Sequence, residues 1–114
     1  MFNSVLVVED RLEHFAFLEQ ALEQHNAEMR LESVQTVADA KQKVHADFDL
    51  YILDLELPDG EGIELIPDIR KTNPDAKIMV NTVFEEDEMF FKAMRLGIDG
   101  YLLKTASQGS LLGS

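Results

Sequence analysis

Four polar sites in this sequence each lie at the end of a segment rich in apolar residues. They are Glu9-Asp10, Asp54, Thr82 and Lys104, which together supply carboxylates, a hydroxyl and an ammonium group. Carboxylates packed side by side repel one another, so their pKa values rise unless a cation lies among them. An oxygen-only site with positions open to water and phosphate is the kind that Mg²⁺ prefers. An ammonium and a hydroxyl nearby would meet a phosphoryl group with a positive charge and a hydrogen bond.

Each of the four sites has an ordinary structural explanation when it is taken alone. Asp10 could cap a helix, Asp54 could belong to a turn at the end of a strand, and Thr82 could also cap a helix. Lys104 could be a solvated surface lysine, which is the usual position of a lysine. Because all four follow predicted strands, the coincidence favours a single shared site.

The apolar runs before these sites are predicted to be the strands of one sheet. Residues 4–8, with the sequence Ser-Val-Leu-Val-Val, form a continuous run that is typical of a strand buried on both faces. A central strand is expected at 48–53, and it runs directly into Asp54. Similar runs predict the remaining strands at 29–34, 77–81 and 100–103.

Segments with helical spacing separate these strands, because apolar residues in them recur every three or four positions. Thr36 is positioned to cap the second of these helices, and Gly97 to end the fourth. Pro67 lies inside the third and removes a backbone donor, so we expect a kink or a late start there. Segment 57–62 has the composition of a loop. The four helices are expected at about 11–25, 36–44, 63–71 and 85–96.

The strict alternation of strands and helices predicts an α/β fold with one doubly wound, five-stranded parallel sheet that carries helices on both faces. In such sheets the functional crevice lies at the carboxyl ends of the strands, near the point where the strand order reverses. All four polar sites fall at that edge. We expect residues 1–114 to form a single domain, with 106–114 as a short C-terminal tail or the remnant of a last helix.

The composition narrows the classes of function. The formal net charge is −12, from 22 acidic and 10 basic residues, so the chain should be repelled by nucleic acid and by anionic membranes. We therefore expect no direct binding to nucleic acid and no membrane association. No apolar run approaches the roughly 20 residues of a membrane span, and the N-terminus lacks the features of a signal peptide. The absence of cysteine excludes disulfides and thiolate metal sites and suits a cytoplasmic protein.

Four motifs and one glycine carry a resemblance that covers nearly the whole chain. They are Val5-Leu6-Val7-Val8-Glu9-Asp10, Leu53-Asp54-Leu55-Glu56-Leu57-Pro58 with Gly62, Val80-Asn81-Thr82, and Gly100-Tyr101-Leu102-Leu103-Lys104. Their order and spacing resemble the CheY-like receiver domains of response regulators, in two-component signal transduction. The resemblance implies a flavodoxin-like sheet with the strand order 2-1-3-4-5. The segment from Gly100 to Ser107 also resembles the NarL/FixJ group, whose receivers precede a helix-turn-helix domain.

The resemblance implies a role for each matched residue of the acidic site. Asp54 resembles the acceptor that becomes an aspartyl phosphate and also contacts the metal ion. Asp10 resembles the direct Mg²⁺ ligand, with Glu9 assisting through water. The backbone carbonyl of Glu56 resembles the third protein ligand.

The resemblance also implies a signalling role around that site. Lys104 resembles the lysine that pairs with the phosphoryl oxygens, Thr82 the switch hydroxyl, and Tyr101 the aromatic residue that rotates with it. The donor would be a phosphohistidine on a histidine kinase or a phosphotransfer protein. The chain would be a phosphoacceptor that catalyses its own phosphotransfer and dephosphorylation, rather than an enzyme, and it would regulate an output domain or partner.

Three features depart from the family pattern. Val83 follows Thr82 where alanine or glycine is usual, and its branched side chain should crowd the path of the phosphoryl group. Glu56 and Phe84 occupy positions that flank the attacking water, so we expect slow loss of the phosphoryl group. The fifth helix of the family is truncated or missing, which would expose part of the sheet. The expected explanation is that the chain is a piece of a longer regulator, and a homodimer is the alternative.

The three histidines, His14, His25 and His45, lie on predicted helices. We expect all three away from the strand ends, at surface or half-buried positions. No role in phosphotransfer or metal binding is predicted for them.

Three other functions remain open. A haloacid-dehalogenase-type phosphatase also uses a strand-end aspartate and Mg²⁺, and Asp54-Leu55-Glu56 faintly resembles its Asp-x-Asp motif, although that motif usually follows a first strand. A pseudo-receiver would work through protein contacts alone, which the complete set of acceptor-site residues argues against. A flavodoxin-like FMN carrier would need a phosphate-binding loop, but the corresponding turn, Glu9-Asp10-Arg11, is acidic.

Overall fold

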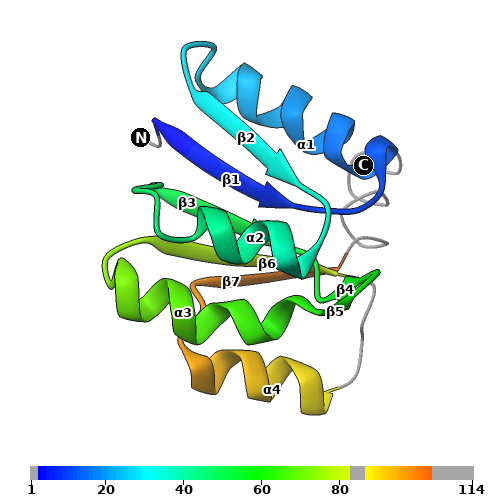
Figure 1. The fold of residues 1–114 in the computed structure, drawn as a ribbon. Helices are drawn as coiled ribbons and strands as arrows, with labels where there is room; N and C mark the ends of the chain where they lie inside the picture. The colour runs from blue at the N-terminus through cyan, green and yellow to red at the C-terminus, as the bar shows by residue number, and fades with distance from the viewer. Residues whose placement is uncertain (1–2, 83–86, 104–114) are drawn as a thin grey trace.

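The computed structural model describes residues 3–82 and 87–103 of the chain. Its centre is a sheet of five parallel strands with helices on both faces (Figure 1). The strand order β2-β1-β3-β6-β7 is the expected order 2-1-3-4-5 when the strands of this sheet are counted along the chain. These strands are β1 (Ser4–Val8), β2 (Arg30–Val34), β3 (Leu50–Leu53), β6 (Lys77–Thr82) and β7 (Gly100–Leu103).

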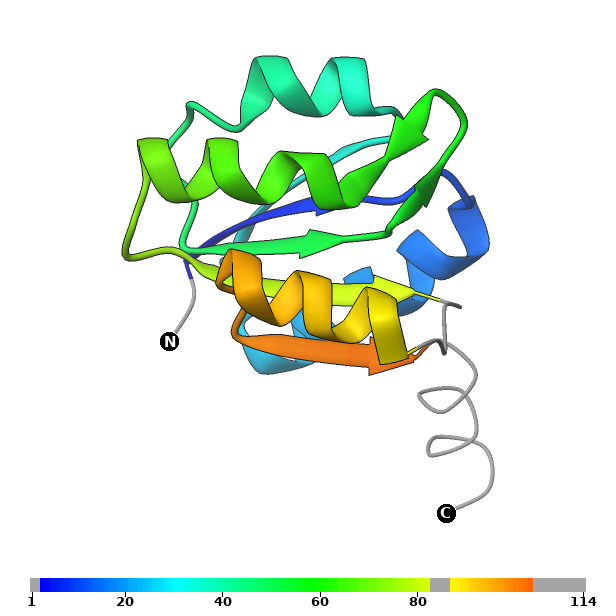
Figure 2. The same cartoon turned by 90° about the horizontal axis from the view of Figure 1, so that it is seen from below.

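Two apolar layers hold the helices to the sheet, because successive strand residues point to opposite faces. Val5 and Val7 of β1 pack on the side covered by α1. Leu6 and Val8 of the same strand belong to the larger core beneath α2, α3 and α4, and Figure 2 shows α1 and α3 on opposite sides of the sheet. Both faces of β1 are buried, as its continuous apolar run predicts. The helices are α1 (Leu12–His25), α2 (Val37–Lys43), α3 (Leu65–Thr72) and α4 (Asp87–Leu96).

The ends of several elements differ from prediction by one or two residues. β3 begins at Leu50 rather than at residue 48, because the Phe48 amide donates to the Ala46 carbonyl (3.1 Å) in a local turn. β2 begins one residue later than expected. The predicted helix ends are confirmed, since the Thr36 side chain caps α2 and Gly97 follows α4 with a φ of 95°.

The segment predicted as a loop contains a small hairpin, so that prediction was wrong in part. β4 (Glu56–Leu57) pairs in antiparallel fashion with β5 (Gly60–Glu61), and a 3₁₀ turn, η1 (Gly62–Glu64), follows. α3 begins at Leu65, which places Pro67 in its first turn, where amides have no acceptor within the helix. The late start predicted from Pro67 is therefore confirmed.

Part of the sheet face beside α1 is open among the described residues. Met79 of β6 and Leu102 of β7 are 36% and 37% exposed although both lie within the sheet. The segment expected to form a short tail or the remnant of a last helix, 106–114, lies outside the described residues. No helix within 3–82 and 87–103 combines the length and the apolar character needed to cross a bilayer.

Candidate functional site

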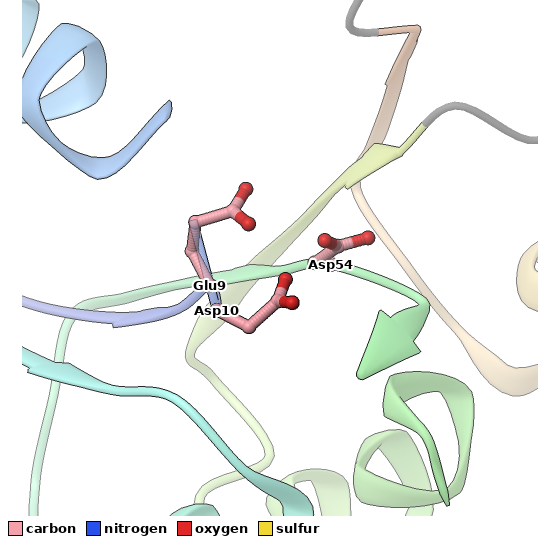
Figure 3. A group of neighbouring side chains, drawn as sticks. All are labelled: Glu9, Asp10 and Asp54. Atoms are coloured by element: carbon pink, nitrogen blue, oxygen red, sulfur yellow. The ribbon is translucent and has the colours of Figure 1, made fainter. Parts of the chain in front are cut away.

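Two neighbouring strands deliver acidic side chains to one edge of the sheet. Glu9 and Asp10 follow β1, and Asp54 follows β3, which pairs with β1. The hydrogen-bond ladder continues one residue past each strand, because the Glu9 amide donates to the Val34 carbonyl (3.0 Å) and the Asp54 amide to the Val8 carbonyl (2.9 Å). These bonds hold the backbone where the side chains leave it. The three carboxylates turn toward one another in Figure 3.

The three carboxylates form a compact cluster of oxygen atoms. One oxygen of each lies within 4.8 Å of the others, and Glu9 and Asp54 are only 3% and 4% exposed. Like charges at this spacing cost free energy unless a cation lies among them. An all-oxygen donor set fits a hard divalent cation such as Mg²⁺ or Ca²⁺. The structure therefore brings Glu9, Asp10 and Asp54 together as the sequence predicts.

Backbone amides orient two of these carboxylates. Oε2 of Glu9 accepts a hydrogen bond from the Arg11 amide (3.1 Å), and Oδ1 of Asp54 accepts one from the Glu56 amide (3.1 Å). The N-cap residue of α1 is Arg11, so the alternative reading of Asp10 as a helix cap is wrong. Asp10 contributes its carboxylate to the cluster instead.

The hairpin after β3 folds tightly against the backbone of Asp54. The Gly62 amide donates to the Leu55 carbonyl (3.0 Å), and a Cβ atom on residue 62 would lie only 2.0 Å from the carbonyl oxygen of Asp54. A residue with no side chain is needed for this approach. The hairpin also brings Glu56 to the pocket beside the cluster, with its side chain exposed. The metal-ligand role of the Glu56 carbonyl stays a prediction.

A carboxylate in the turn of the hairpin fastens it to α2. Asp59 accepts hydrogen bonds from the Val37 amide (2.8 Å) and the Ala38 amide (3.0 Å), the first two of that helix. These backbone hydrogen bonds lower the pKa of the Asp59 carboxyl. The hairpin that carries Glu56 is thereby attached to a helix beside the site.

The acidic cluster opens into a pocket of about 260 Å³ that also receives His14. Nδ1 of His14 lies 3.7 Å from Oε1 of Glu9, so the prediction that this histidine lies away from the strand ends is wrong. Only three residues separate β1 from α1, which keeps the first turn of the helix beside the strand end. His14 is half-buried and His25 and His45 are exposed, as expected. The pocket is lined by Asp10, Arg11, His14, Asp54, Glu56, Leu57 and Pro58.

The two predicted switch residues lie on the strands beyond β3. Thr82 is the fully buried last residue of β6, so it does not cap α4. Tyr101 of β7 is half-buried, and its ring packs edge-on against Phe90 of α4 with 5.3 Å between the ring centroids. Their switch roles stay predictions. The predictions for Val83, Phe84 and Lys104 concern residues outside the described ranges.

Known sequences resemble this chain along most of its length. Residues 5–114 match the family described as the response regulator receiver domain. The oxygen regulatory protein NreC of Staphylococcus epidermidis is 38% identical over 93 residues, an alignment that covers 76% of this chain and 42% of NreC. The chain spans less than half the length of the curated relatives that it matches.

Solved structures share the same fold. A CheY-like receiver domain protein from Methanospirillum hungatei superposes with a TM-score of 0.84 at 26% identity, covering 99% of this chain and 90% of that one. A response regulator from Burkholderia pseudomallei, solved with a phosphorylated aspartic acid, a calcium ion and citrate, gives a TM-score of 0.83 at 27% identity, covering 97% and 65%. The CheY-like architecture expected from the sequence is confirmed.

Proposed function

The chain belongs to the response regulator receiver domain family of two-component systems, and on this premise we propose that Asp54 accepts a phosphoryl group with the help of Mg²⁺. The observation that carries the proposal is the convergence of Glu9, Asp10 and Asp54, whose oxygens lie within 4.8 Å of one another. Receiver domains bind a divalent metal, and this cluster offers oxygen ligands of the kind that Mg²⁺ prefers.

The residues at the edge of the sheet have two proposed roles, which are to bind the metal ion and to accept the phosphoryl group. Glu9 and Asp10 would hold the ion beside the acceptor, with Asp54 and the Glu56 carbonyl as further ligands. When bound, Mg²⁺ supplies positive charge that offsets the carboxylates and the charge on the transferring group. The Glu56 amide donates to Oδ1 of Asp54 (3.1 Å) and so orients the carboxylate that is proposed to attack.

The proposed donor is a phosphohistidine on a histidine kinase or a phosphotransfer protein. An oxygen of Asp54 bonds to phosphorus while the phosphorus–nitrogen bond breaks, and the donor imidazole keeps the electron pair and then gains a proton. Lys104 pairs with the phosphoryl oxygens, the Thr82 hydroxyl moves toward them, and Tyr101 rotates with it. In this role the chain is a cytoplasmic signalling domain rather than an enzyme, and its conformation regulates an output domain or partner, alone or as a homodimer.

Incubation with a small phosphodonor tests the proposal. With acetyl phosphate and Mg²⁺ we expect one phosphoryl group per chain, and mass spectrometry should locate it on Asp54. Chelation of the metal and the Asp54→Asn variant should each abolish the modification. Asp68→Asn, which changes an exposed carboxylate on α3, is the matched control and should be modified as the wild type is.

Two results would replace the proposal with one of its alternatives. Release of phosphate from small esters over many turnovers would indicate a phosphatase of the haloacid-dehalogenase type. A folded chain that takes up no phosphoryl group, and shows no spectral response to beryllofluoride with Mg²⁺, would indicate a phosphorylation-independent pseudo-receiver.

A further inference from the structure

His14 belongs to the pocket of the acidic cluster, but the proposed function does not use it. Its side chain is 17% exposed, and its Nδ1 lies 3.7 Å from Oε1 of Glu9. It lines the same pocket as Asp10 and Asp54. An imidazole therefore stands at the rim of a site whose other candidate ligands are all oxygen atoms.

The two oxygens of the Glu9 carboxylate have different neighbours. Oε2 accepts the hydrogen bond of the Arg11 amide at 3.1 Å, whereas Oε1 lies near Nδ1 of His14. The backbone of the β1–α1 turn thus holds the carboxylate with one oxygen directed to the helix that carries His14.

The distance between Glu9 and His14 suits two ligands of one metal ion. When bonds to an octahedral ion are about 2.1 Å, adjacent ligand atoms are about 3.0 Å apart and opposite ones about 4.2 Å apart. The 3.7 Å from Nδ1 to Oε1 lies between these limits. His14 lies outside the group of residues whose ligand atoms are within 4.8 Å of one another, so its side chain would have to turn toward Asp10 and Asp54 to contact the same ion.

We propose, building on the function proposed above, that His14 is a nitrogen ligand that raises the preference of this site for borderline cations such as Ni²⁺, Co²⁺ and Zn²⁺. Imidazole binds these ions well, whereas Mg²⁺ is bound mainly by carboxylate, carbonyl and water oxygens. Carboxylates alone would give the ordinary affinity series of divalent ions. The imidazole adds affinity for one class of ion and little for the other.

A simpler role for His14 makes a different prediction. A protonated imidazole that only neutralised Glu9 would be in competition with every divalent cation. Its removal would then strengthen the binding of Mg²⁺ and Ni²⁺ alike. A histidine that binds the metal is needed for Ni²⁺ and dispensable for Mg²⁺, so the ratio of the two affinities separates the roles.

Calorimetric titration of the tag-free, metal-free chain with Ni²⁺ and with Mg²⁺ tests the proposal. His14→Gln should weaken Ni²⁺ binding about tenfold or more and change Mg²⁺ binding less than about threefold. The visible absorption bands of bound Co²⁺ should also shift in this variant, because a nitrogen ligand is replaced by oxygen. His25→Gln and His45→Gln are matched controls, since both change exposed histidines outside the pocket.

An affinity ratio of Ni²⁺ to Mg²⁺ that is the same in His14→Gln and the wild type would overturn the proposal. Asp10→Ala separates this failure from failure of the proposed function, because Mg²⁺ binding that survives Asp10→Ala would mean that the acidic cluster is not the metal site. If His14→Gln does not fold in a thermal melt, the Co²⁺ spectrum of the wild type decides. Bands of oxygen-only coordination would then refute the nitrogen ligand.

Discussion

The two ends of the central sheet differ in how their acidic side chains are compensated. At the amino ends of β6 and β7, Asp99 is neutralised within the fold by Arg70 of α3, whose Nη2 lies 2.8 Å from Oδ2 of the aspartate. At the carboxyl ends of β1 and β3, Glu9, Asp10 and Asp54 gather their charges in one small volume. One end uses charge to join parts of the fold, and the other concentrates charge that a cation can bind.

Arg70 stabilises the amino end of the sheet with hydrogen bonds to backbone carbonyls, so no bound ion is needed there. Its Nε donates to the Gly97 carbonyl (2.7 Å), and its Nη1 donates to the Pro74 carbonyl (3.1 Å) and to the Ala76 carbonyl. One guanidinium thereby connects the end of α3 and the end of α4 to the start of β6. The comparison of the two ends predicts that mutations at the amino end change stability, and that mutations at the carboxyl end change metal binding.

The largest change in stability is expected from Arg70→Ala, at about 3 kcal/mol, because several carbonyls lose their donor and Asp99 loses its partner. The arginine and aspartate side chains are 24% and 39% exposed, so the ion pair itself adds little and the carbonyl bonds dominate. Urea unfolding measures the loss. Lys71→Ala, at the next and exposed position of α3, should stay within about 0.5 kcal/mol of the wild type. A comparable loss in both variants would refute the role given to Arg70.

Saturating Mg²⁺ should stabilise the chain by about 2.7 kcal/mol at 100 times its dissociation constant, because the ion binds only the folded cluster. Melting temperatures with and without Mg²⁺ measure this gain. Asp10→Ala should lose most of it, whereas Arg70→Ala should keep it, since distant sites behave additively. A gain of wild-type size in Asp10→Ala would place the ion away from the cluster.

A smaller effect of opposite sign is expected from Asp10→Asn when divalent metal is chelated. Removing one of three neighbouring charges should raise the free energy of unfolding by about 1 kcal/mol. Denaturant titration in EDTA checks this result, with Asp68→Asn as the control for an isolated carboxylate. Destabilisation by Asp10→Asn under these conditions would show that the cluster is already compensated inside the fold, and the contrast between the two ends would disappear.

The smallest expected effect is the change with pH in the contribution of Asp99 to stability. Burial acts to raise the pKa of Asp99, but the Ile78 amide and the Arg70 guanidinium outweigh it, so the pKa lies below its usual value. The contribution of Asp99 is therefore complete above its unfolded pKa of about 3.9 and is lost as pH falls through the lower folded value. The difference in free energy of unfolding between the wild type and Asp99→Asn should be constant near neutrality and shrink below about pH 4. A difference that widens in acid would contradict this assignment.

The sheet is more predictable from sequence than the loops that complete its edge. Strands such as β1 and β3 are buried on both faces, so a continuous apolar run marks them clearly. The β4–β5 hairpin has only two residues in each strand. Its Pro-Asp-Gly sequence is equally typical of an open turn, so composition alone does not reveal the pairing.

The acidic site is predictable where it depends on topology and unpredictable where it depends on local geometry. Asp10 and Asp54 meet because neighbouring parallel strands end at one edge. The position of His14 in the pocket was not predicted, because helical periodicity assigns a residue only to a face of a helix. It does not show that the first turn of the helix lies beside a strand end. The hydrogen bond from Val37 to Asp59 joins residues 22 positions apart and has no periodic signal.

The closeness of Gly62 to the Asp54 peptide limits how this domain can diverge. Even a methyl group at position 62 would meet the Asp54 carbonyl at 2.0 Å and push the hairpin away from the acceptor. The glycine side chain has no group that could hold a metal ion or a phosphate. A homologue that kept Glu9, Asp10 and Asp54 but replaced Gly62 would still lose the position of the hairpin beside Asp54. The positions least tolerant of substitution in such a site can therefore include one without functional groups of its own.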